Sequence, residues 1–361
     1  MGPLPLFGAY DSVIRPFQPG DTILLQRLQR QATKLNLVQS LLRPRSPSWV
    51  ALSALLPWDN AGNTTYVLHQ NGHGLARAGF LQAQRRPGRN EADVLSLAPA
   101  LDTRTGHPAI WEKLLAHYVT EEAGGQTLRI YADVPDQPLL VNTFSHIGFS
   151  VYSRLTVWRL VSGEGRSFVP SARAELRPVQ RGDEWELLRL YARSTPMPVQ
   201  VAEGAVGDQA NNPPILAWWN GGEPQSFVLQ HRDELVGCVR VVSEQAGIWM
   251  QFWADPHYPQ LEVGRHLLSI ALASVRNHDE RLPLYVAVKD YQGGLGPMLN
   301  DFGFAPFADY ARMVKHMVQR VVETETVRMG AVEVVPEVLV TFRPLEESQK
   351  GVSRRTPAAL R

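Results

Sequence analysis

The sequence predicts an α/β protein in which one structural unit occurs twice in tandem. Two observations support this prediction: a motif near the start of the chain recurs in its second half, and the elements after each copy follow the same order. Residues 14–21 (IRPFQPGD) recur as residues 176–183 (LRPVQRGD). Internal similarity of this kind indicates a repeated fold.

The first elements of the two copies correspond one to one. Each motif is typical of a short strand that stops at a turn, where Asp21 or Asp183 is suited to cap the helix that follows. A hairpin comes next in each copy, predicted within 65–82 and within 226–242. Helical and strand periodicity therefore alternate in both halves, as an α/β fold requires.

The later elements keep the same order. Each copy continues with an apolar strand (93–98 and 247–253), an amphipathic helix (110–123 and 267–275) and another strand (127–132 and 284–288). A short helix and a Gly-Phe step, Gly148-Phe149 or Gly303-Phe304, lead into the last strand. The spacing between equivalent positions shortens slowly while the order holds, which short deletions explain. The competing interpretation is a single large α/β domain with coincidental similarities.

These matches define the expected domain organisation. It comprises an N-terminal domain (11–160), a Gly/Ser-rich linker (161–173), a C-terminal domain (174–317), an extra β-hairpin (318–345) and a polar, disordered tail (346–361).

Composition narrows the functional classes. The chain has 361 residues, a formal net charge of +1 and 44% hydrophobic residues. We therefore expect ordinary cores and no electrostatic attraction to nucleic acid or an anionic membrane. The single cysteine, Cys238, excludes an internal disulfide and favours a reducing compartment. No signal peptide or membrane-spanning run is evident, so the expected localisation is cytoplasmic.

The repeated order of elements resembles the GNAT N-acetyltransferase fold, a mixed, mostly antiparallel sheet flanked by helices. The resemblance covers about residues 11–160 and 174–317, and its most specific marks are the sequences SHIGF (145–149) and NDFGF (300–304). Arg15-Pro16 and Arg177-Pro178, each followed by Gly-Asp, are also similar to the family's first strand. The sequence therefore predicts a tandem duplication of a GNAT-like domain.

The resemblance implies a site for acetyl-CoA as a cosubstrate. In the family, a glycine loop after the fourth strand binds the CoA pyrophosphate through free amides at a helix N-terminus. The family pattern is Gln or Arg, two residues, Gly, one residue, then Gly or Ala. The C-terminal copy reads QLEVGRH (260–266) and the N-terminal copy TRTGHPA (103–109), and neither matches it fully. In the N-terminal loop, Pro108 suits the first turn of a helix but removes one amide donor.

We favour the C-terminal loop for binding, because it offers more amides and the forked cation of Arg265. The predicted cofactor-binding residues are Trp253, Val263, Gly264, Arg265 and His266. The competing interpretation is that both loops are ordinary strand-to-helix turns. Trp253 is also typical of sheet packing.

Acetyl transfer needs a base for the amine and an acid for the leaving thiolate. Many GNAT enzymes place a tyrosine four residues before the Gly-Phe glycine as the acid, but here those positions hold Phe144 and Leu299. Tyr291, just past a strand of the C-terminal copy, is the predicted substitute, although a loop tyrosine packing its ring is the competing interpretation. Asp255 is the predicted base, with His257 and Glu262 as further candidates. Asp255 and His257 flank Pro256, which is also typical of a simple turn.

The leading functional hypothesis is an acyl-CoA-dependent N-acetyltransferase whose C-terminal domain transfers an acetyl group to an amine. The acceptor is expected to be a small molecule or a protein amine. The alternative is a catalytically silent CoA-binding or interaction module. A longer acyl or aminoacyl-tRNA donor is a third hypothesis, which the near-neutral charge does not favour. We expect no metal and no nucleic-acid or membrane partner, and a monomer or homodimer.

Overall fold

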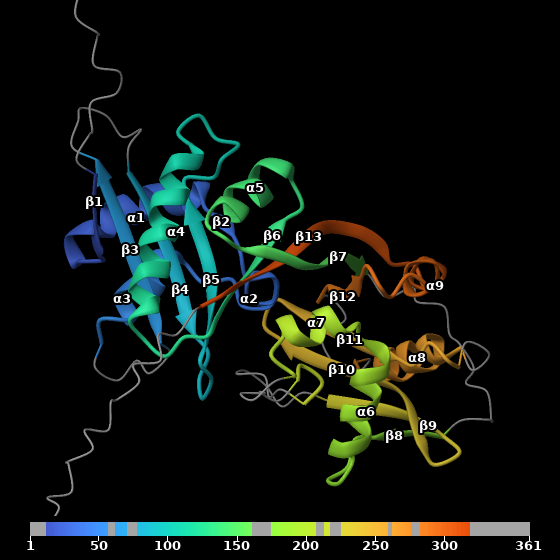
Figure 1. Cartoon of the computed structure of the whole chain (residues 1–361). Coiled ribbons are helices and arrows are strands. Elements are labelled where there is room, and N and C mark those ends of the chain that lie inside the picture. The colour runs from blue at the N-terminus through green and yellow to red at the C-terminus, as the bar shows by residue number, and fades with distance from the viewer. Residues whose placement is uncertain are drawn as a thin grey trace, which may run out of the picture. The chain divides into compact units, whose positions relative to one another are not determined.

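The strands form one mixed sheet in the order β1-β3-β4-β5-β6-β13-β7-β12-β11-β10-β9-β8, with β2 paired to β5 off this path (Figure 1). The computed structural model describes residues 12–56, 62–70, 78–160, 175–206, 213–216, 225–258, 262–275 and 282–317. They all belong to one compact unit, Met1–Gln319. The linker (161–173), extra hairpin (318–345) and tail (346–361) expected from the sequence lie outside the described residues.

The first repeat begins with a strand, a helical segment and a hairpin. Its elements are β1 (Ser12–Pro16), the 3-10 turns η1 (Pro19–Asp21) and η2 (Gln29–Gln31), α1 (Thr22–Leu28), β2 (Thr33–Lys34), α2 (Leu37–Leu42), α3 (Pro47–Ser53), β3 (Asn63–Gln70), β4 (Ala78–Arg85), β5 (Glu91–Ala98), α4 (Pro108–Ala123), β6 (Arg129–Pro135), α5 (Pro138–His146) and β7 (Ser150–Leu160). Pro108 stands in the first turn of α4 as its fixed φ favours, and the His107 side chain accepts from the Ala109 amide at 3.2 Å.

The second repeat follows the same plan. Its elements are β8 (Glu175–Pro178), α6 (Glu184–Ser194), α7 (Met197–Ala202), β9 (Gln225–His231), β10 (Glu234–Glu244), β11 (Gly247–Ala254), α8 (Val263–Val275), β12 (Leu284–Lys289), α9 (Leu295–Asp301) and β13 (Ala305–His316). Both repeats pair their strands antiparallel except β5 with β6 and β11 with β12, which run parallel. The predicted mixed, mostly antiparallel sheet flanked by helices is therefore confirmed.

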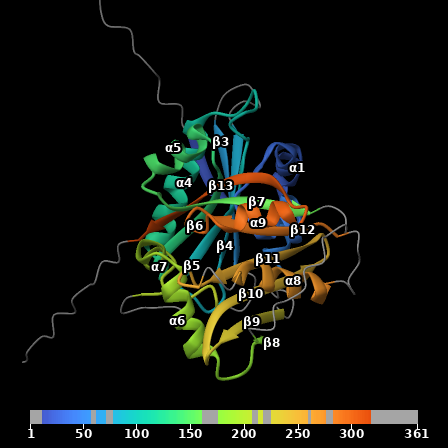
Figure 2. The same cartoon turned by 90° about the vertical axis from the view of Figure 1, so that its right-hand side faces the viewer.

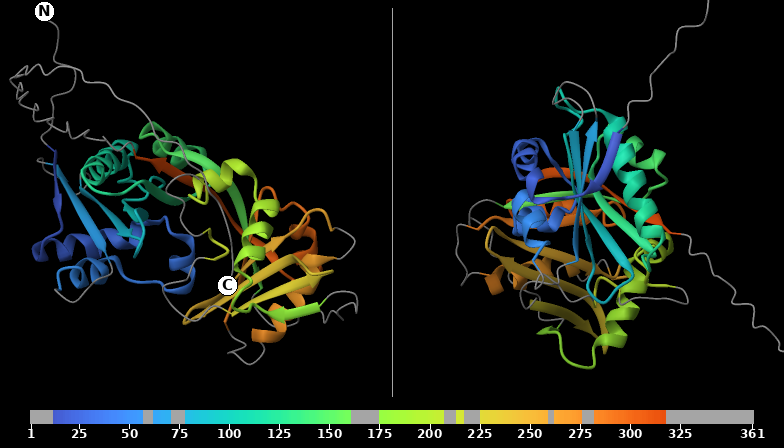
Figure 3. Two further views of the ribbon diagram at one scale, coloured as in Figure 1. Left: turned by 60° about the horizontal axis from the view of Figure 1, so that its bottom comes forward. Right: turned by 90° about the vertical axis from the view of Figure 1, so that its left-hand side faces the viewer.

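Helices cover both faces of each part of the sheet. In the first repeat, α1 and α3 lie on one face and α4 and α5 on the other (Figure 3). In the second, α6 packs on Trp253 and Cys238 while α8 and α9 pack on the opposite face. Cys238 is buried and free, and burial raises the pKa of its thiol to about 12, so it serves as a small core residue.

The two repeats exchange their last strands. β13 of the second repeat pairs antiparallel with β6 of the first, and β7 of the first repeat pairs antiparallel with β12 of the second. β7 and β13 also pair with each other, and they run side by side in Figures 1 and 2. Each repeat therefore completes its sheet with a strand from the other.

The repeated Arg-Pro…Gly-Asp motif builds the same turn twice. Arg15 donates to both oxygens of Asp21 at 2.7 and 2.8 Å, and Arg177 does the same to Asp183 at 2.7 and 2.9 Å. Each aspartate also accepts the backbone amide three residues before it. The predicted capping by these aspartates is not observed, because their oxygens point back to the arginine and the preceding turn.

Glycines at equivalent places allow close packing and a tight turn. A Cβ at Gly79 of β4 would lie 2.6 Å from Ile110 of α4, and one at Gly237 of β10 would lie 2.9 Å from Leu267 of α8. Both helices therefore begin against a bare strand. The Gly-Phe step is also repeated, with φ of +85° at Gly148 and +86° at Gly303, where glycine is favoured.

Candidate functional site

Each repeat contains a wedge where two parallel strands separate. β5 pairs with β6 only from Glu91/Arg129 to Asp93/Tyr131, and β11 pairs with β12 only from Ile248/Leu284 to Met250/Val286. Beyond these points the backbone groups of the facing strands no longer reach one another. Because buried backbone groups need partners, each wedge must be filled.

The first wedge is closed by the backbone of its own repeat. The Leu35 amide donates to the Leu95 carbonyl at 2.9 Å, and the Leu35 carbonyl accepts the Asp133 amide at 2.7 Å. β2 adds pairs from Thr33 and Lys34 to β5. The chain before α2 thus lies between the separated strands and uses their hydrogen-bonding groups.

The second wedge is bridged by one side chain. The Gln292 carboxamide donates to the Phe252 carbonyl at 2.8 Å and accepts the Lys289 amide at 3.1 Å. Phe252 lies two residues beyond the last paired residue of β11, as Leu95 does on β5. A rotatable side chain therefore stands where the first repeat has a peptide unit.

Three of the residues predicted to bind the cofactor pack into the core beside this wedge. Val263 and His266 are buried, and burial lowers the pKa of the His266 imidazole. A Cβ at Gly264 would lie 2.9 Å from Leu295 and 3.0 Å from the sulfur of Met298. Glycine at this position therefore brings α8 and α9 together, a reason that the loop pattern does not reveal.

Among the residues predicted to bind the cofactor, Arg265 is one whose side chain reaches the surface. Its guanidinium is about one-third exposed and pairs with Asp301, and with Glu262 at 3.4 Å. Both carboxylates are at least half exposed, so these pairs are weak and exchangeable. The first-turn amides of Val263 and Gly264 have no acceptor within the helix itself.

Trp253 and Asp255 lie on the other side of the sheet's end. Trp253 is buried in the core beneath α6, with the Arg240 guanidinium 5.9 Å from its ring centroid. Asp255 is buried and accepts both the amide and Nδ1 of His257, at 3.0 and 2.8 Å. Its other oxygen lies 2.9 Å from Arg193 Nε. One oxygen therefore accepts hydrogen bonds and the other is held by an ion pair alone, so that Asp255 ties the turn after β11 to α6.

Tyr291 directly precedes the bridging Gln292. Its hydroxyl is buried and has no hydrogen-bond partner within the described part of the chain. The Lys289 ammonium lies 5.4 Å from the Tyr291 ring centroid. A buried hydroxyl normally has a partner, so an unsatisfied one beside a wedge is a candidate ligand contact. The two positions where the family has its tyrosine, Phe144 and Leu299, are buried in the cores.

A buried polar cluster adjoins Tyr291 and was not predicted. Glu203, just after α7, accepts from the Tyr191 hydroxyl at 2.7 Å and from Arg312 at 2.9 Å, and Lys289 Nζ lies 3.8 Å away. Burial alone raises the pKa of the Glu203 carboxyl, but Lys289 and Arg312 outweigh it and lower the pKa. Glu203 is therefore a fixed carboxylate. One signal in the sequence could have revealed this cluster: Lys289 is a charged residue at the end of the apolar strand 284–289.

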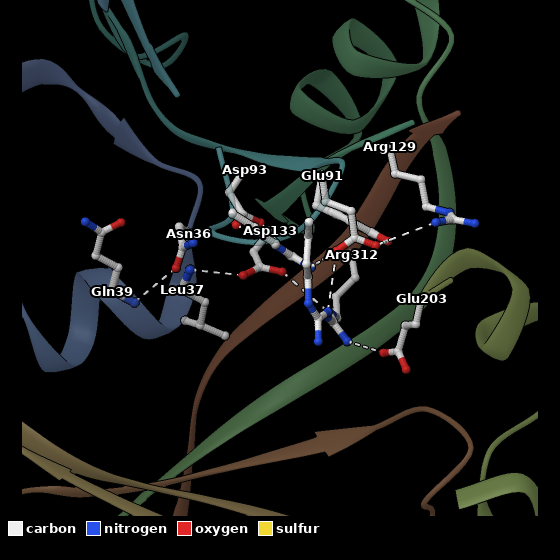
Figure 4. Close-up of polar contacts among 12 residues, drawn as sticks. Asn36, Leu37, Gln39, Glu91, Asp93, Arg129, Asp133, Glu203 and Arg312 are labelled. Carbon is white, nitrogen blue, oxygen red and sulfur yellow. Dashed lines mark hydrogen bonds and ion pairs between the residues drawn. The ribbon is translucent and has the colours of Figure 1, made fainter. Parts of the chain in front are cut away.

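Arg312 joins this cluster to the first repeat. It pairs with Glu203 and, at 3.4 Å, with Asp133 of β6, whose other oxygen accepts the Leu37 amide (Figure 4). Burial lowers the pKa of Arg312, but Tyr152 and the two carboxylates outweigh it and raise the pKa. Arg312 of the exchanged strand β13 therefore links the cluster beside Tyr291 to the first repeat.

The sheet order and the two wedges define a duplicated GNAT-like fold. A tandem GNAT protein from the clavulanic acid biosynthesis pathway aligns with 85% of this chain and 98% of its own, at 15% identity and a TM-score of 0.50. A GCN5-related N-acetyltransferase from Sphaerobacter thermophilus aligns with 86% of this chain and 98% of its own, at 10% identity and a TM-score of 0.48. No family model and no curated protein matches the chain.

The first of these similarities shows that the chain has the fold of tandem GNAT proteins, as predicted. At this level of identity it shows the fold alone. The described helices include none that is long and apolar enough to cross a membrane. Within the same residues, no three His, Cys, Asp or Glu side chains gather as metal ligands.

Proposed function

We propose that the second repeat binds an acyl-CoA, of which acetyl-CoA is the first to test, and transfers its acyl group to an amine. The observation that carries this proposal is the contrast between the two wedges. The first is filled by backbone at Leu35, whereas the second is held by the side chain of Gln292. The similar tandem GNAT protein is described in a state without AcCoA, which makes this ligand the first to test.

The residues of the second wedge suit the parts of this cosubstrate. When Gln292 turns away, the Phe252 carbonyl and the Lys289 amide become an acceptor and a donor for the amides of the pantetheine arm. The first-turn amides of α8 and the exchangeable Arg265 suit the diphosphate. Val263, Gly264 and His266 hold α8 in place from the core, and Trp253 supports the sheet beneath it.

Tyr291 is the proposed acid. The amine nitrogen attacks the thioester carbonyl carbon, a C–N bond forms and the C–S bond breaks. The Tyr291 hydroxyl gives its proton to the departing thiolate, and the proton lost by the amine goes to water, from which Tyr291 is reprotonated. The buried Tyr291 hydroxyl has no hydrogen-bond partner among the described residues, which supports this role. Asp255, the predicted base, is given no part in the step, because it pairs with Arg193 and accepts from His257. The neighbouring Lys289 offers a positive charge to the thiolate.

The second candidate function is a CoA-binding or interaction module without turnover. Phe144 and Leu299, which replace the family's acid, and the ion-paired carboxylate of Asp255 favour it. A CoA-binding module would bind acetyl-CoA as the enzyme does and differ from it in the chemical step, whereas an interaction module would not bind it.

Calorimetric titration with acetyl-CoA tests binding, and release of free thiol in the presence of an amine panel tests turnover. Tyr291→Phe is expected to lower the rate about 10²-fold or more with little change in affinity, since a positioned acid contributes that much. Tyr258→Phe is the matched control, because the Tyr258 hydroxyl bonds Glu234 at 3.2 Å in the same repeat. Binding without thiol release would support a silent CoA-binding module. No binding would refute acyl transfer and favour the interaction module.

A further inference from the structure

A row of polar side chains crosses the sheet of the first repeat. Lys34 of β2 is paired with Ser96 of β5, Ser96 with Gln82 of β4, and Gln82 with Thr65 of β3. Residues paired across neighbouring strands share one face of the sheet. Ser96, Gln82 and Thr65 are buried, although apolar side chains would fill a purely structural core at lower cost.

The hydrogen bonds of this row are complete except at one end. Gln82 donates to the Pro47 carbonyl at 2.7 Å and to Thr65 at 3.2 Å, and the Ser96 hydroxyl donates to Gln82 at 3.2 Å. The Lys34 ammonium has no hydrogen bond and no carboxylate partner among the residues the structure describes. Burial lowers the pKa of its ammonium, and no acidic group counters this.

Lys34 faces a cavity of about 50 Å³, whose lining includes Gln39, Ser40, Arg43, Arg45, Gln82 and Ser96. None of the lining residues is acidic. Arg43 is held by Glu244 of the second repeat at 2.7 Å, while Arg45 is exposed at the surface. A buried water needs roughly 10–15 Å³ of such volume, so this cavity has room for a few waters or for one small polar group.

We propose that this cavity binds the oxyanion group, carboxylate or phosphate, of a small ligand. A half-buried ammonium without a counter-ion, a guanidinium at the surface and neutral hydrogen-bonding groups are complementary to a compact anion. The cavity is too small for a whole coenzyme. It also lies in the repeat whose wedge is closed, so the proposal does not depend on acyl-CoA binding by the second repeat.

The test measures anion binding to the full chain by calorimetry, with sodium phosphate and sodium acetate as probes. Sodium chloride at matched ionic strength separates a specific site from general screening. Lys34→Met is expected to weaken binding of the preferred probe by about tenfold to a hundredfold, as expected when a charge-assisted hydrogen bond is lost. Arg27→Gln, an exposed arginine of α1 outside the cavity lining, is the matched control and should bind as the wild type does.

Thermal unfolding is a second test, because it separates a ligand-binding lysine from one that only stabilises the fold. Without added anion, Lys34→Met should raise the melting temperature, because it removes a desolvated charge that lacks a partner. Binding should also weaken as the pH rises through the lowered pKa of Lys34, since the ammonium then loses its charge. A preference for phosphate or for acetate identifies the source of the oxyanion. Equal stabilisation by chloride, or unchanged binding in Lys34→Met, would overturn the proposal, as would a melting temperature lowered by that substitution.

Discussion

Removing the side chain that bridges the second wedge should strengthen binding of acetyl-CoA. Gln292→Ala deletes two hydrogen bonds, to the Phe252 carbonyl at 2.8 Å and from the Lys289 amide at 3.1 Å. Two such bonds stabilise the ligand-free protein by about 1–3 kcal/mol in total. If the ligand displaces Gln292, the bound state never contains these bonds, so the variant destabilises only the free state.

The same free energy then appears as a gain in affinity. A difference of about 1–3 kcal/mol corresponds to roughly 5-fold to 150-fold tighter binding. Calorimetric titration with acetyl-CoA measures this gain, and thermal unfolding of the ligand-free variant should show a matching loss of stability. Gln230→Ala is the control, because Gln230 accepts a single hydrogen bond from Arg177 elsewhere in the same repeat. Weaker binding by Gln292→Ala would refute the displacement of Gln292 and make it a ligand contact.

Three further substitutions test the packing and charges of the second repeat. Gly237→Ala forces a Cβ against α8 and should destabilise the protein by about 1–3 kcal/mol in urea unfolding, whereas Gly293→Ala, where a Cβ meets no atom within 4 Å, should change little. Glu203→Ala removes the carboxylate beside the buried Lys289 and leaves the partly exposed Arg312 with Asp133 alone, so it should cost about 3–5 kcal/mol by the same assay. Asp183→Asn should remove part of the acid sensitivity of unfolding. The hydrogen bond from Arg177 lowers the pKa of Asp183 in the folded protein. The ion pair therefore stabilises the fold above the ordinary pKa of aspartate, and this stabilisation is lost as the pH falls through the lowered pKa.

The fold was largely predictable because local signals agree with it. The Arg-Pro…Gly-Asp motif recurs because each copy forms the same bidentate pair, and the Gly-Phe steps recur because both need a positive φ. The strand exchange carries no such signal. β7 and β13 have the same place in their repeats, so the sequence pattern is identical whether each strand joins its own sheet or the other one.

The candidate site was predictable only in part. Tyr291 was predicted because it lies just past the strand that ends at Val288, and its buried hydroxyl, unpartnered among the described residues, keeps it a candidate. Gly264 fitted a loop pattern, yet the contacts that require a glycine there come from α9. Glu203 and Arg312 lie more than a hundred residues apart, and no local pattern connects them.

The exchange explains how one wedge can be closed without loss of the other. β12, which forms one side of the second wedge, is held on its other edge by β7 of the first repeat, from Leu284/Leu160 to Lys289/Leu155. The polar cluster behind that strand also takes Asp133 from the first repeat through Arg312. The first repeat therefore has a structural role in the second wedge whether or not it binds a ligand of its own. The first wedge therefore does not need to bind a ligand for the contacts that hold β12 to be retained. A first wedge filled by backbone beside an intact sheet is the expected result.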